Sequence, residues 1–275
     1  MNRKWRALLA ILLLLIGLGV LMYPTASSYL NSLRESYAIQ ELQEVLEGQT
    51  DTQLARQRAL AEAYNRSLSV GDLTDAFGES EYGAEYDQIL DYGEGVMGYL
   101  TIPKLELELP IYHGTSKEVL AKGVGHLPQS ALPIGGAGNH TVLSGHTGMP
   151  NARLFTDLTE LAEGDVFYIH ILDETLTYQV DQILTVLPEE TQALQPEAGK
   201  DYCTLVTCTP YGVNSHRLLV RGERVREAQA DQPQTAEPGT VSQKPAMPLT
   251  LKLALGAAAL LLVLGAVILF RKNRG

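Results

Sequence analysis

A strand–turn–strand pattern at residues 204–222 constrains the fold more than any other part of this 275-residue chain. It reads Thr-Leu-Val-Thr-Cys, then Thr-Pro-Tyr-Gly-Val-Asn, then Ser-His-Arg-Leu-Leu-Val-Arg-Gly. Val, Leu and Thr favour strands in both arms, and the Pro, Gly and Asn between them favour a turn, so the pattern predicts a β-hairpin. Folding this hairpin brings Arg217 of the second arm close to Cys208 at the end of the first.

Cys208 and Arg217 together suggest a reactive thiol. A cysteine attacks as its thiolate, and a nearby cation lowers the pKa of the thiol and can stabilise charge on an attacked carbonyl. A lone cysteine at the end of an apolar strand is more often an inert core residue, so the second cysteine matters. Cys203 and Cys208 would lie roughly 16 Å apart on opposite strand faces, too far for a disulfide. We expect Cys203 to be a packed thiol and Cys208 to be the reactive one.

A histidine partner for the thiol is harder to choose, because the chain has six histidines. His146 follows an apolar run and lies between two glycines, which is typical of a side chain presented on a loop at a strand end. His216 is next to Arg217 on a strand and should therefore face away from Cys208. His140, just before the apolar run, fits an ordinary strand-edge residue. From the residues alone, His146 is one candidate among several.

The hairpin resembles the active-site signature of sortases, and in particular of the class C enzymes that build pili in Gram-positive bacteria. The match includes Thr-Cys-Thr-Pro-Tyr-Gly-Val-Asn-Ser-His-Arg, with the arginine nine positions after the cysteine. The resemblance spans about residues 96–225 and includes Leu-Ser-Gly-His-Thr-Gly-Met-Pro-Asn-Ala-Arg-Leu-Phe from residue 143. It implies that Cys208, His146 and Arg217 are catalytic. Many class C members have Arg where this chain has Thr147.

An upstream segment resembles the lid that covers the active site of class C sortases. Residues 73–78 read Leu-Thr-Asp-Ala-Phe-Gly, whereas the family lid has Asp-Pro followed by an aromatic residue. Asp75 and Phe77 supply the acid and the aromatic ring, and Ala76 replaces the proline. Proline restricts its own φ and the residue before it, so its absence predicts a less rigid lid. The alternative interpretation is an Asp-capped turn in a linker.

Two apolar stretches, residues 5–23 and 253–270, flank the rest of the chain. Each is close to the roughly 20 residues that a membrane-spanning helix needs. For the first stretch a cleaved signal peptide is the alternative, because small residues follow it, but its apolar run is longer than most signal sequences have. Basic residues lie just outside both stretches, at 3–4 and 271–274. They predict cytoplasmic termini and an extracytoplasmic body at the cell membrane.

Between these stretches the sequence changes character. Residues 28–47 and 51–68 have a helical composition and predict a two-helix element. From about residue 96, short β-type runs with turns between them predict a mainly β fold, either a closed barrel or a sandwich, and the resemblance implies the closed sortase β-barrel. The predicted segments are a membrane anchor or signal segment (1–24), a helical N-terminal element (25–72), a lid segment and connection (73–95), a catalytic β-barrel (96–226), a polar linker (227–248) and a C-terminal transmembrane helix with a basic tail (249–275).

The net charge of −11, from 21 Lys+Arg and 32 Asp+Glu, argues against nucleic-acid binding. We find no metal-ligand spacing, and the implied chemistry needs no cofactor. The resemblance implies a membrane-bound cysteine transpeptidase that cleaves a Leu-Pro-x-Thr-Gly-like sorting signal between Thr and Gly. It would then join the signal to a lysine amine of another pilin subunit. The alternatives are a sortase that anchors surface proteins to peptidoglycan and a non-enzymatic, membrane-tethered assembly protein.

Overall fold

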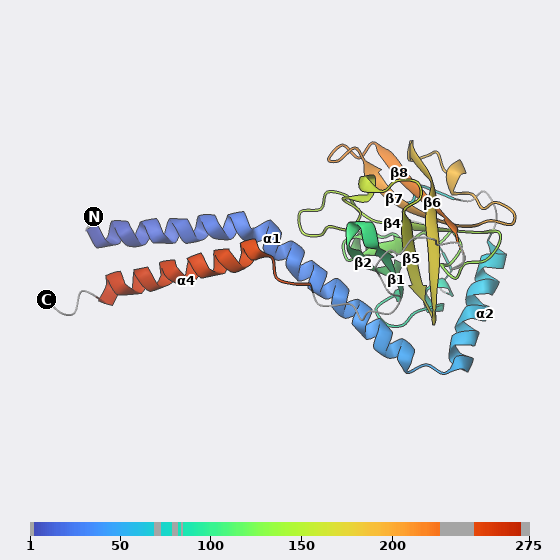
Figure 1. The fold of residues 1–275 in the computed structure, drawn as a ribbon, viewed down its shortest axis with the longest axis horizontal. Coiled ribbons are helices and arrows are strands. Elements are labelled where there is room, and N and C mark those ends of the chain that lie inside the picture. Colours follow the sequence, from blue (N-terminus) through green and yellow to red (C-terminus); the bar gives the residue numbers. More distant parts are fainter. Residues whose placement is uncertain (1–2, 69–72, 79–81, 84, 226–244, 271–275) are drawn as a thin grey trace. The chain divides into compact units, whose positions relative to one another are not determined.

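A computed structural model describes residues 3–68, 73–78, 82–83, 85–225 and 245–270 of the chain. The chain divides into two compact units, one of residues 34–243 and the other of residues 1–33 together with 244–275 (Figure 1). Most of the expected polar linker (227–248) and the basic residues at 271–274 fall outside the described residues.

The larger unit contains a closed β-barrel whose strands follow one another in the order β1-β2-β3-β4-β7-β8-β6-β5. Neighbouring strands are antiparallel except for two parallel pairs, β2 with β3 and β4 with β7. The predicted mainly β fold with a closed barrel is confirmed, and the alternative of a β-sandwich is wrong. The strands are β1 Val96–Ile102, β2 Leu107–His113, β3 Val124–His126, β4 Asn139–Ser144, β5 Val166–Ile171, β6 Glu174–Val186, β7 Asp201–Thr209 and β8 His216–Arg224.

Alternation of side chains along the strands fills the barrel interior. In β5, Phe167 and Ile169 are fully buried, whereas Tyr168 between them is partly exposed. The same alternation in β7 sends Cys203 and Leu205 into the core. Cys208, an odd number of positions from Cys203, therefore lies on the outer face of the barrel.

Helices α2 and α3 belong to the same unit as the barrel, and α4 belongs to the other unit. Helix α1 is one continuous helix although it contains Pro24, so the first apolar stretch and the first predicted helix of the N-terminal element join. Thr50 begins α2 with a reciprocal cap, in which its hydroxyl accepts from the Gln53 N–H (3.3 Å) and the Gln53 Oε1 accepts from the Thr50 N–H (2.9 Å). The helices are α1 Arg3–Glu47, α2 Asp51–Ser67, α3 Lys117–Leu120 and α4 Leu249–Phe270, with short 3₁₀ turns η1 Tyr86–Gln88, η2 Pro103–Leu105, η3 Leu158–Glu160 and η4 Gln192–Leu194.

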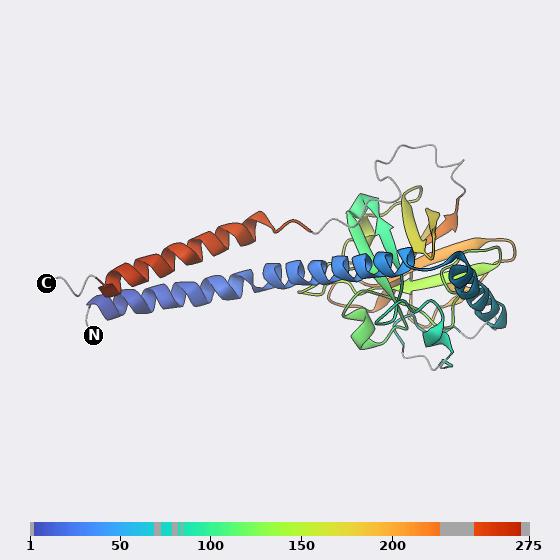
Figure 2. The ribbon, with the colours of Figure 1, turned by 90° about the horizontal axis from the view of Figure 1, so that it is seen from below.

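Helix α2 lies beside the barrel (Figures 1 and 2). Polar contacts attach it there. The Asn65 side chain accepts from the Leu132 N–H (2.7 Å) and donates to the Leu132 carbonyl (3.2 Å). Arg58 pairs with Glu174 of β6 at 2.9 Å. These contacts give the second helix of the predicted N-terminal element a fixed place on the barrel surface.

Two helices among the described residues, α1 and α4, are long and apolar enough to cross a membrane. In α1 the apolar part is the N-terminal stretch, and α4 is apolar along its whole length. A helix that is apolar on every face and exposes those faces suits a lipid environment better than water. The two helices indicate membrane anchoring, as predicted.

Three histidines of the larger unit are held in their neutral form by burial. Desolvation of the charged imidazolium lowers the pKa of His126 to about 3, and those of His140 and His170 to about 4. All three lie on barrel strands, β3, β4 and β5. In the unfolded chain a histidine has a pKa of about 6.5.

We therefore expect acid to destabilise the barrel. Between about pH 6.5 and pH 4 the unfolded state binds more protons than the folded state, so the free energy of unfolding falls as the pH falls, by up to about 1.4 kcal/mol per pH unit for each histidine. Urea unfolding at a series of pH values in this window measures the slope. The variant His170→Asn should show a smaller slope than the unsubstituted protein, and identical slopes would contradict the assignment.

Candidate active site

The β7–β8 hairpin brings Cys208 and Arg217 together. The two residues are directly opposite each other across the antiparallel strands, at the end of the pairing nearest the turn. The N–H groups of Val213 and Asn214 both donate to the Pro210 carbonyl at 3.0 Å and close the turn. The predicted hairpin and the predicted neighbourhood of Cys208 and Arg217 are confirmed. Cys208 is partly exposed, and Cys203 is buried.

His146 lies just beyond the end of β4, the strand that runs parallel to β7. The pairing of the two strands continues past β4, because the Gly145 N–H donates to the Val206 carbonyl (3.0 Å) and the Thr207 hydroxyl donates to the Gly145 carbonyl (2.7 Å). The next residue is His146 after Gly145 and Cys208 after Thr207. The parallel register thus brings the histidine level with the thiol.

Close packing explains the glycine before His146. A Cβ atom on Gly145 would lie 2.6 Å from the ring of Phe155, so a larger residue would force the ring or the backbone to move. The Phe155 N–H also donates to the His146 carbonyl (3.1 Å). The backbone on both sides of the imidazole is therefore fixed by the 145–155 segment.

The competing histidines are engaged elsewhere. His140 is 2% exposed, and its ring nitrogens contact the Gln195 carbonyl (3.0 Å) and the Thr204 hydroxyl (2.7 Å). His216 pairs with Thr209 in the hairpin and contacts the Ser215 hydroxyl at 2.8 Å. These placements favour His146 over both alternatives.

The lid segment, residues 73–78, contacts the arginine of the hairpin through an acid. Arg217 donates from Nε to Asp75 Oδ1 (2.8 Å) and from Nη2 to Asp75 Oδ2 (2.6 Å), so the carboxylate and the guanidinium form a two-pronged pair. Such pairs are stronger and more directional than single contacts. The Arg217 side chain is only 12% exposed in this arrangement.

The rest of the lid segment also packs on the site. The Phe77 ring lies 5.5 Å from the His146 ring and 5.1 Å from the Arg217 guanidinium carbon. Ser144, at the end of β4, donates its hydroxyl to the Ala76 carbonyl (2.7 Å). The segment is also a turn, as the linker interpretation predicted, because the Gly78 N–H donates to the Asp75 carbonyl (2.7 Å). The turn and the contacts with Arg217 and His146 coexist.

Beneath the lid segment lies an apolar surface, made by side chains on the outer face of β4, β7, β8 and β6 and by their neighbours. Ala76 is 2% exposed there, and Leu73 and Phe77 pack against the same surface. A peptide that replaced the lid segment would meet the same surface. The residues of this apolar surface are Leu127, Val142, Leu184, Val186, Ala193, Leu194, Val206 and Leu219.

The electrostatics hold the thiol protonated. Burial raises the pKa of Cys208 above its ordinary value, Arg217 lowers it, and Asp75 raises it again. The cation alone was expected to depress this pKa, but burial and the paired carboxylate outweigh it. Burial also lowers the pKa of His146. With the lid segment in place, both groups are therefore neutral at neutral pH.

Sequence reasoning missed the partners of the lid segment. It proposed Asp75 and Phe77 as lid residues but did not pair Asp75 with Arg217, and it did not identify Ser144 at all. An acid in the lid and a single arginine beside the cysteine could have suggested the pair by charge. Within the described part of the chain, no three His, Cys, Asp or Glu side chains gather closely enough to hold a metal ion.

Removing the two lid side chains should expose the thiol. We expect Asp75→Ala combined with Phe77→Ala to speed the modification of Cys208 by a small thiol reagent a few-fold, in proportion to the fraction of time the site is open. Rates are compared at a pH where the thiol is fully ionised, so that access alone is measured. Thr74→Ala is the control, because Thr74 bonds Gln129 and not the site. Equal rates in a folded double variant would make the segment a simple linker.

Comparison with known proteins gives a consistent family. The Sortase domain family matches residues 100–225. Sortase A of Bacillus anthracis is 31% identical over 130 residues, which cover 47% of this chain and 60% of that protein. The chain spans 52% to 63% of the length of the first curated relatives that it matches.

Solved structures match over a larger share. The pilus-related Sortase C of Group B Streptococcus is 44% identical, with a TM-score of 0.64, and the match covers 68% of this chain and 97% of that one. Sortase C-1 from Actinomyces oris is 48% identical, with a TM-score of 0.61, and the match covers 64% of this chain and 99% of that one.

Proposed function

Because the chain belongs to the sortase family, we propose that it is a membrane-bound cysteine transpeptidase of class C that joins pilin subunits. Its donor would carry a Leu-Pro-x-Thr-Gly-like sorting signal, and its acceptor would be a lysine amine of another pilin. The observation that carries the proposal is the Cys208–Arg217 pair, with His146 level with the thiol and the lid segment over all three. Pilus-related sortases among the similar structures support the choice of substrate.

The reaction begins with departure of the lid segment. When Asp75 leaves Arg217, the guanidinium becomes available, and the carboxylate no longer raises the pKa of the Cys208 thiol. The Cys208 proton can then pass to His146, which gives a thiolate beside a cation. A thiolate–imidazolium pair is the reactive form of such a cysteine.

Acyl transfer to the enzyme follows. The Cys208 thiolate attacks the Thr carbonyl of the sorting signal, and Arg217 stabilises the oxyanion that forms. The Thr–Gly bond breaks, and His146 gives its proton to the departing glycine amine. The product is a thioacyl bond between Cys208 and the threonine of the donor.

Transfer to the acceptor restores the enzyme. The lysine amine attacks the thioacyl carbon, His146 takes the amine proton, and the carbon–sulfur bond breaks. The donor threonine is then linked to the lysine through an isopeptide bond, and Cys208 is free again as a thiolate. No step needs an external oxidant or reductant.

The decisive experiment incubates the purified protein with a pilin that carries its sorting signal. SDS-resistant ladders of linked pilins are expected, and they should be absent with Cys208→Ala. Transfer of the signal to a peptidoglycan stem-peptide amine, with no ladder, would instead support the anchoring sortase. If neither product forms, the result would support the non-enzymatic alternative.

We also propose that both termini are cytoplasmic and that the barrel is outside the cell membrane. The basic residues at 3–4 and 271–274, next to the two apolar stretches, support this orientation. Protease added to intact protoplasts should then degrade the barrel and spare a tag fused at residue 275. Loss of the tag in intact protoplasts would contradict it.

A further inference from the structure

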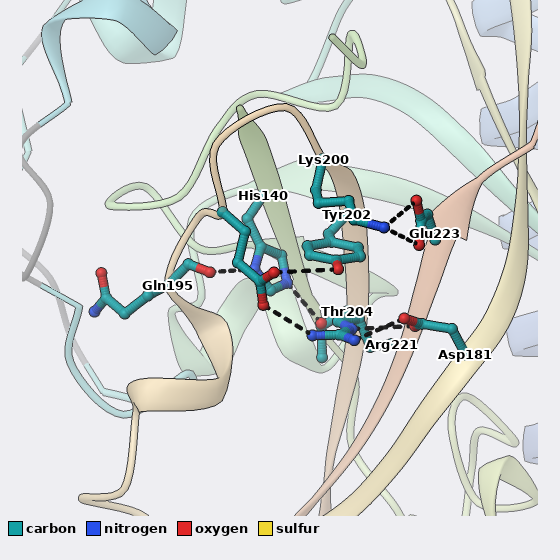
Figure 3. A network of polar contacts seen from close by, with 9 residues as sticks. His140, Asp181, Gln195, Lys200, Tyr202, Thr204, Arg221 and Glu223 are labelled. Atoms are coloured by element: carbon teal, nitrogen blue, oxygen red, sulfur yellow. Dashed lines mark hydrogen bonds and ion pairs between the residues drawn. The ribbon is translucent and has the colours of Figure 1, made fainter. Parts of the chain in front are cut away.

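A polar network lies on the same outer face as the active site, farther along the strands (Figure 3). In β7, Thr204 and Tyr202 share a face with Cys208, because side chains alternate. In β8, Arg221 is opposite Thr204 and shares a face with Arg217. The network therefore continues the same face as the apolar surface, away from the thiol.

Arg221 is fixed on the barrel side of this network. It donates from Nε to Asp181 Oδ1 (3.1 Å) and from Nη2 to Asp181 Oδ2 (2.6 Å), and its guanidinium carbon lies 4.1 Å from the centre of the Tyr202 ring. The register of β6 shifts at Asp181, and a bulge of this kind re-aims a side chain. With 15% of its side chain exposed, Arg221 is largely held by these two partners.

The remaining contacts of the network reach the β6–β7 connection, residues 187–200. Arg221 Nη1 lies 3.6 Å from Glu197 Oε1, and the Tyr202 hydroxyl donates to Glu197 Oε2 (3.5 Å). His140 donates from Nδ1 to the Gln195 carbonyl (3.0 Å), and its other nitrogen accepts from the Thr204 hydroxyl. One neutral imidazole satisfies both contacts, which agrees with the low pKa of His140.

The residue next to Gln195 belongs to the apolar surface under the lid segment. Leu194 is 3% exposed and packs with Val142, Val206 and Leu219 under the lid segment. The contacts that anchor Gln195 and Glu197 come from strands β4, β7 and β8 and involve no residue of the lid segment. They can therefore hold Leu194 in place after the lid segment has left.

We propose that Arg221 is a positioning residue that holds the β6–β7 connection against the barrel, so that Leu194 stays in a fixed place at the apolar surface when a donor peptide binds there. This role rests on the proposed function, since it takes the donor's sorting signal to bind on the apolar surface that the lid segment covers. Arg221 touches no reacting atom. It acts on peptide binding through Glu197 and Tyr202, together with the neighbouring bond from His140 to Gln195.

The test uses full-length protein in detergent, with Asp75→Ala and Phe77→Ala present so that lid opening does not limit binding. Arg221→Gln should raise the KM for a sorting-signal peptide a few-fold, because its contact with Glu197 is a partly exposed ion pair at 3.6 Å, and should leave kcat within about twofold. Hydrogen exchange should quicken at residues 187–199 and stay unchanged in the barrel strands. A purely structural defect would instead lower kcat with the active fraction and leave KM unchanged, which would overturn the proposal.

A milder variant guards against misfolding, because Arg221→Gln leaves Asp181 without its partner. Glu197→Gln with Tyr202→Phe weakens only the contacts of Glu197 with Arg221 and Tyr202. It should raise KM a few-fold, since Glu197 is more than half exposed. Lys104→Gln is the control, because it removes the Lys104–Asp165 ion pair, which involves no residue of the β6–β7 connection, and it should leave KM unchanged. An unchanged KM in the first variant, or an equal rise in the second, would contradict the positioning role of Arg221.

The exchange measurement separates this inference from the proposed function. If the unsubstituted protein cleaves no sorting peptide, the proposed function fails, and exchange at residues 187–199 still tests whether Arg221 holds the connection. Faster exchange there in Arg221→Gln supports this positioning role. Unchanged exchange overturns it.

Discussion

Cys208→Ala is expected to abolish both peptide cleavage and pilin linkage, while Cys203→Ala keeps most of the activity. Removal of the nucleophile from a covalent enzyme costs on the order of a million-fold in rate, which puts the product below detection. Cys203 is fully buried in the barrel core, where loss of one sulfur atom leaves a small cavity and costs about 1–2 kcal/mol of stability. Rates of cleavage of a fluorescent sorting peptide measure the difference.

The two cysteine variants must be compared in folded protein. Circular dichroism and thermal unfolding of each variant provide that check. Equal losses of activity in two folded variants would contradict the division of roles between Cys208 and Cys203. Full activity of Cys208→Ala would contradict the proposed reaction altogether.

Arg217→Lys is expected to lower the rate of cleavage by about 100-fold or more, the range seen when one oxyanion donor is lost. Lysine keeps the charge but lacks the planar fork that can hold two oxygens at once. The same guanidinium donates two hydrogen bonds to Asp75, so lysine also weakens the binding of the lid segment to the site. The two effects oppose each other in the intact protein.

The opposing effects separate in a lid-free background. In protein carrying Asp75→Ala and Phe77→Ala, Arg217→Lys changes only the chemistry, and the full loss in kcat should appear. Arg153→Lys is the matched control, because Arg153 pairs with Asp157 on the surface beyond His146. Near-normal kcat of the Arg217 variant would mean that a diffuse charge is sufficient.

Local sequence predicted the parts of the fold whose partners are close in the chain. The β7–β8 hairpin follows from its turn residues, which also set the register that puts Cys208 opposite Arg217. The reciprocal cap at Thr50 explains why a second helix begins there. In α1, by contrast, helix-forming residues on both sides of Pro24 carry the helix through a boundary that the sequence suggested.

Contacts between distant residues could not be read in the same way. Asp75 and Arg217 are 142 positions apart, and no local pattern relates them. The parallel pairing of β4 with β7, which aligns His146 with Cys208, depends on closure of the whole barrel. Resemblance to a family singles out His146, while composition and spacing alone leave several histidines open.

The pairing of Asp75 with Arg217 also affects which substrates can bind to the protein. A ligand tethered to its own site acts at an effective concentration on the order of millimolar, whatever the dilution of the protein. A free peptide in solution must outcompete that internal ligand, and at micromolar levels it would rarely succeed. Subunits confined to the same membrane reach much higher local densities, so crowding of substrate at the surface, rather than affinity for an isolated signal, would switch the enzyme on.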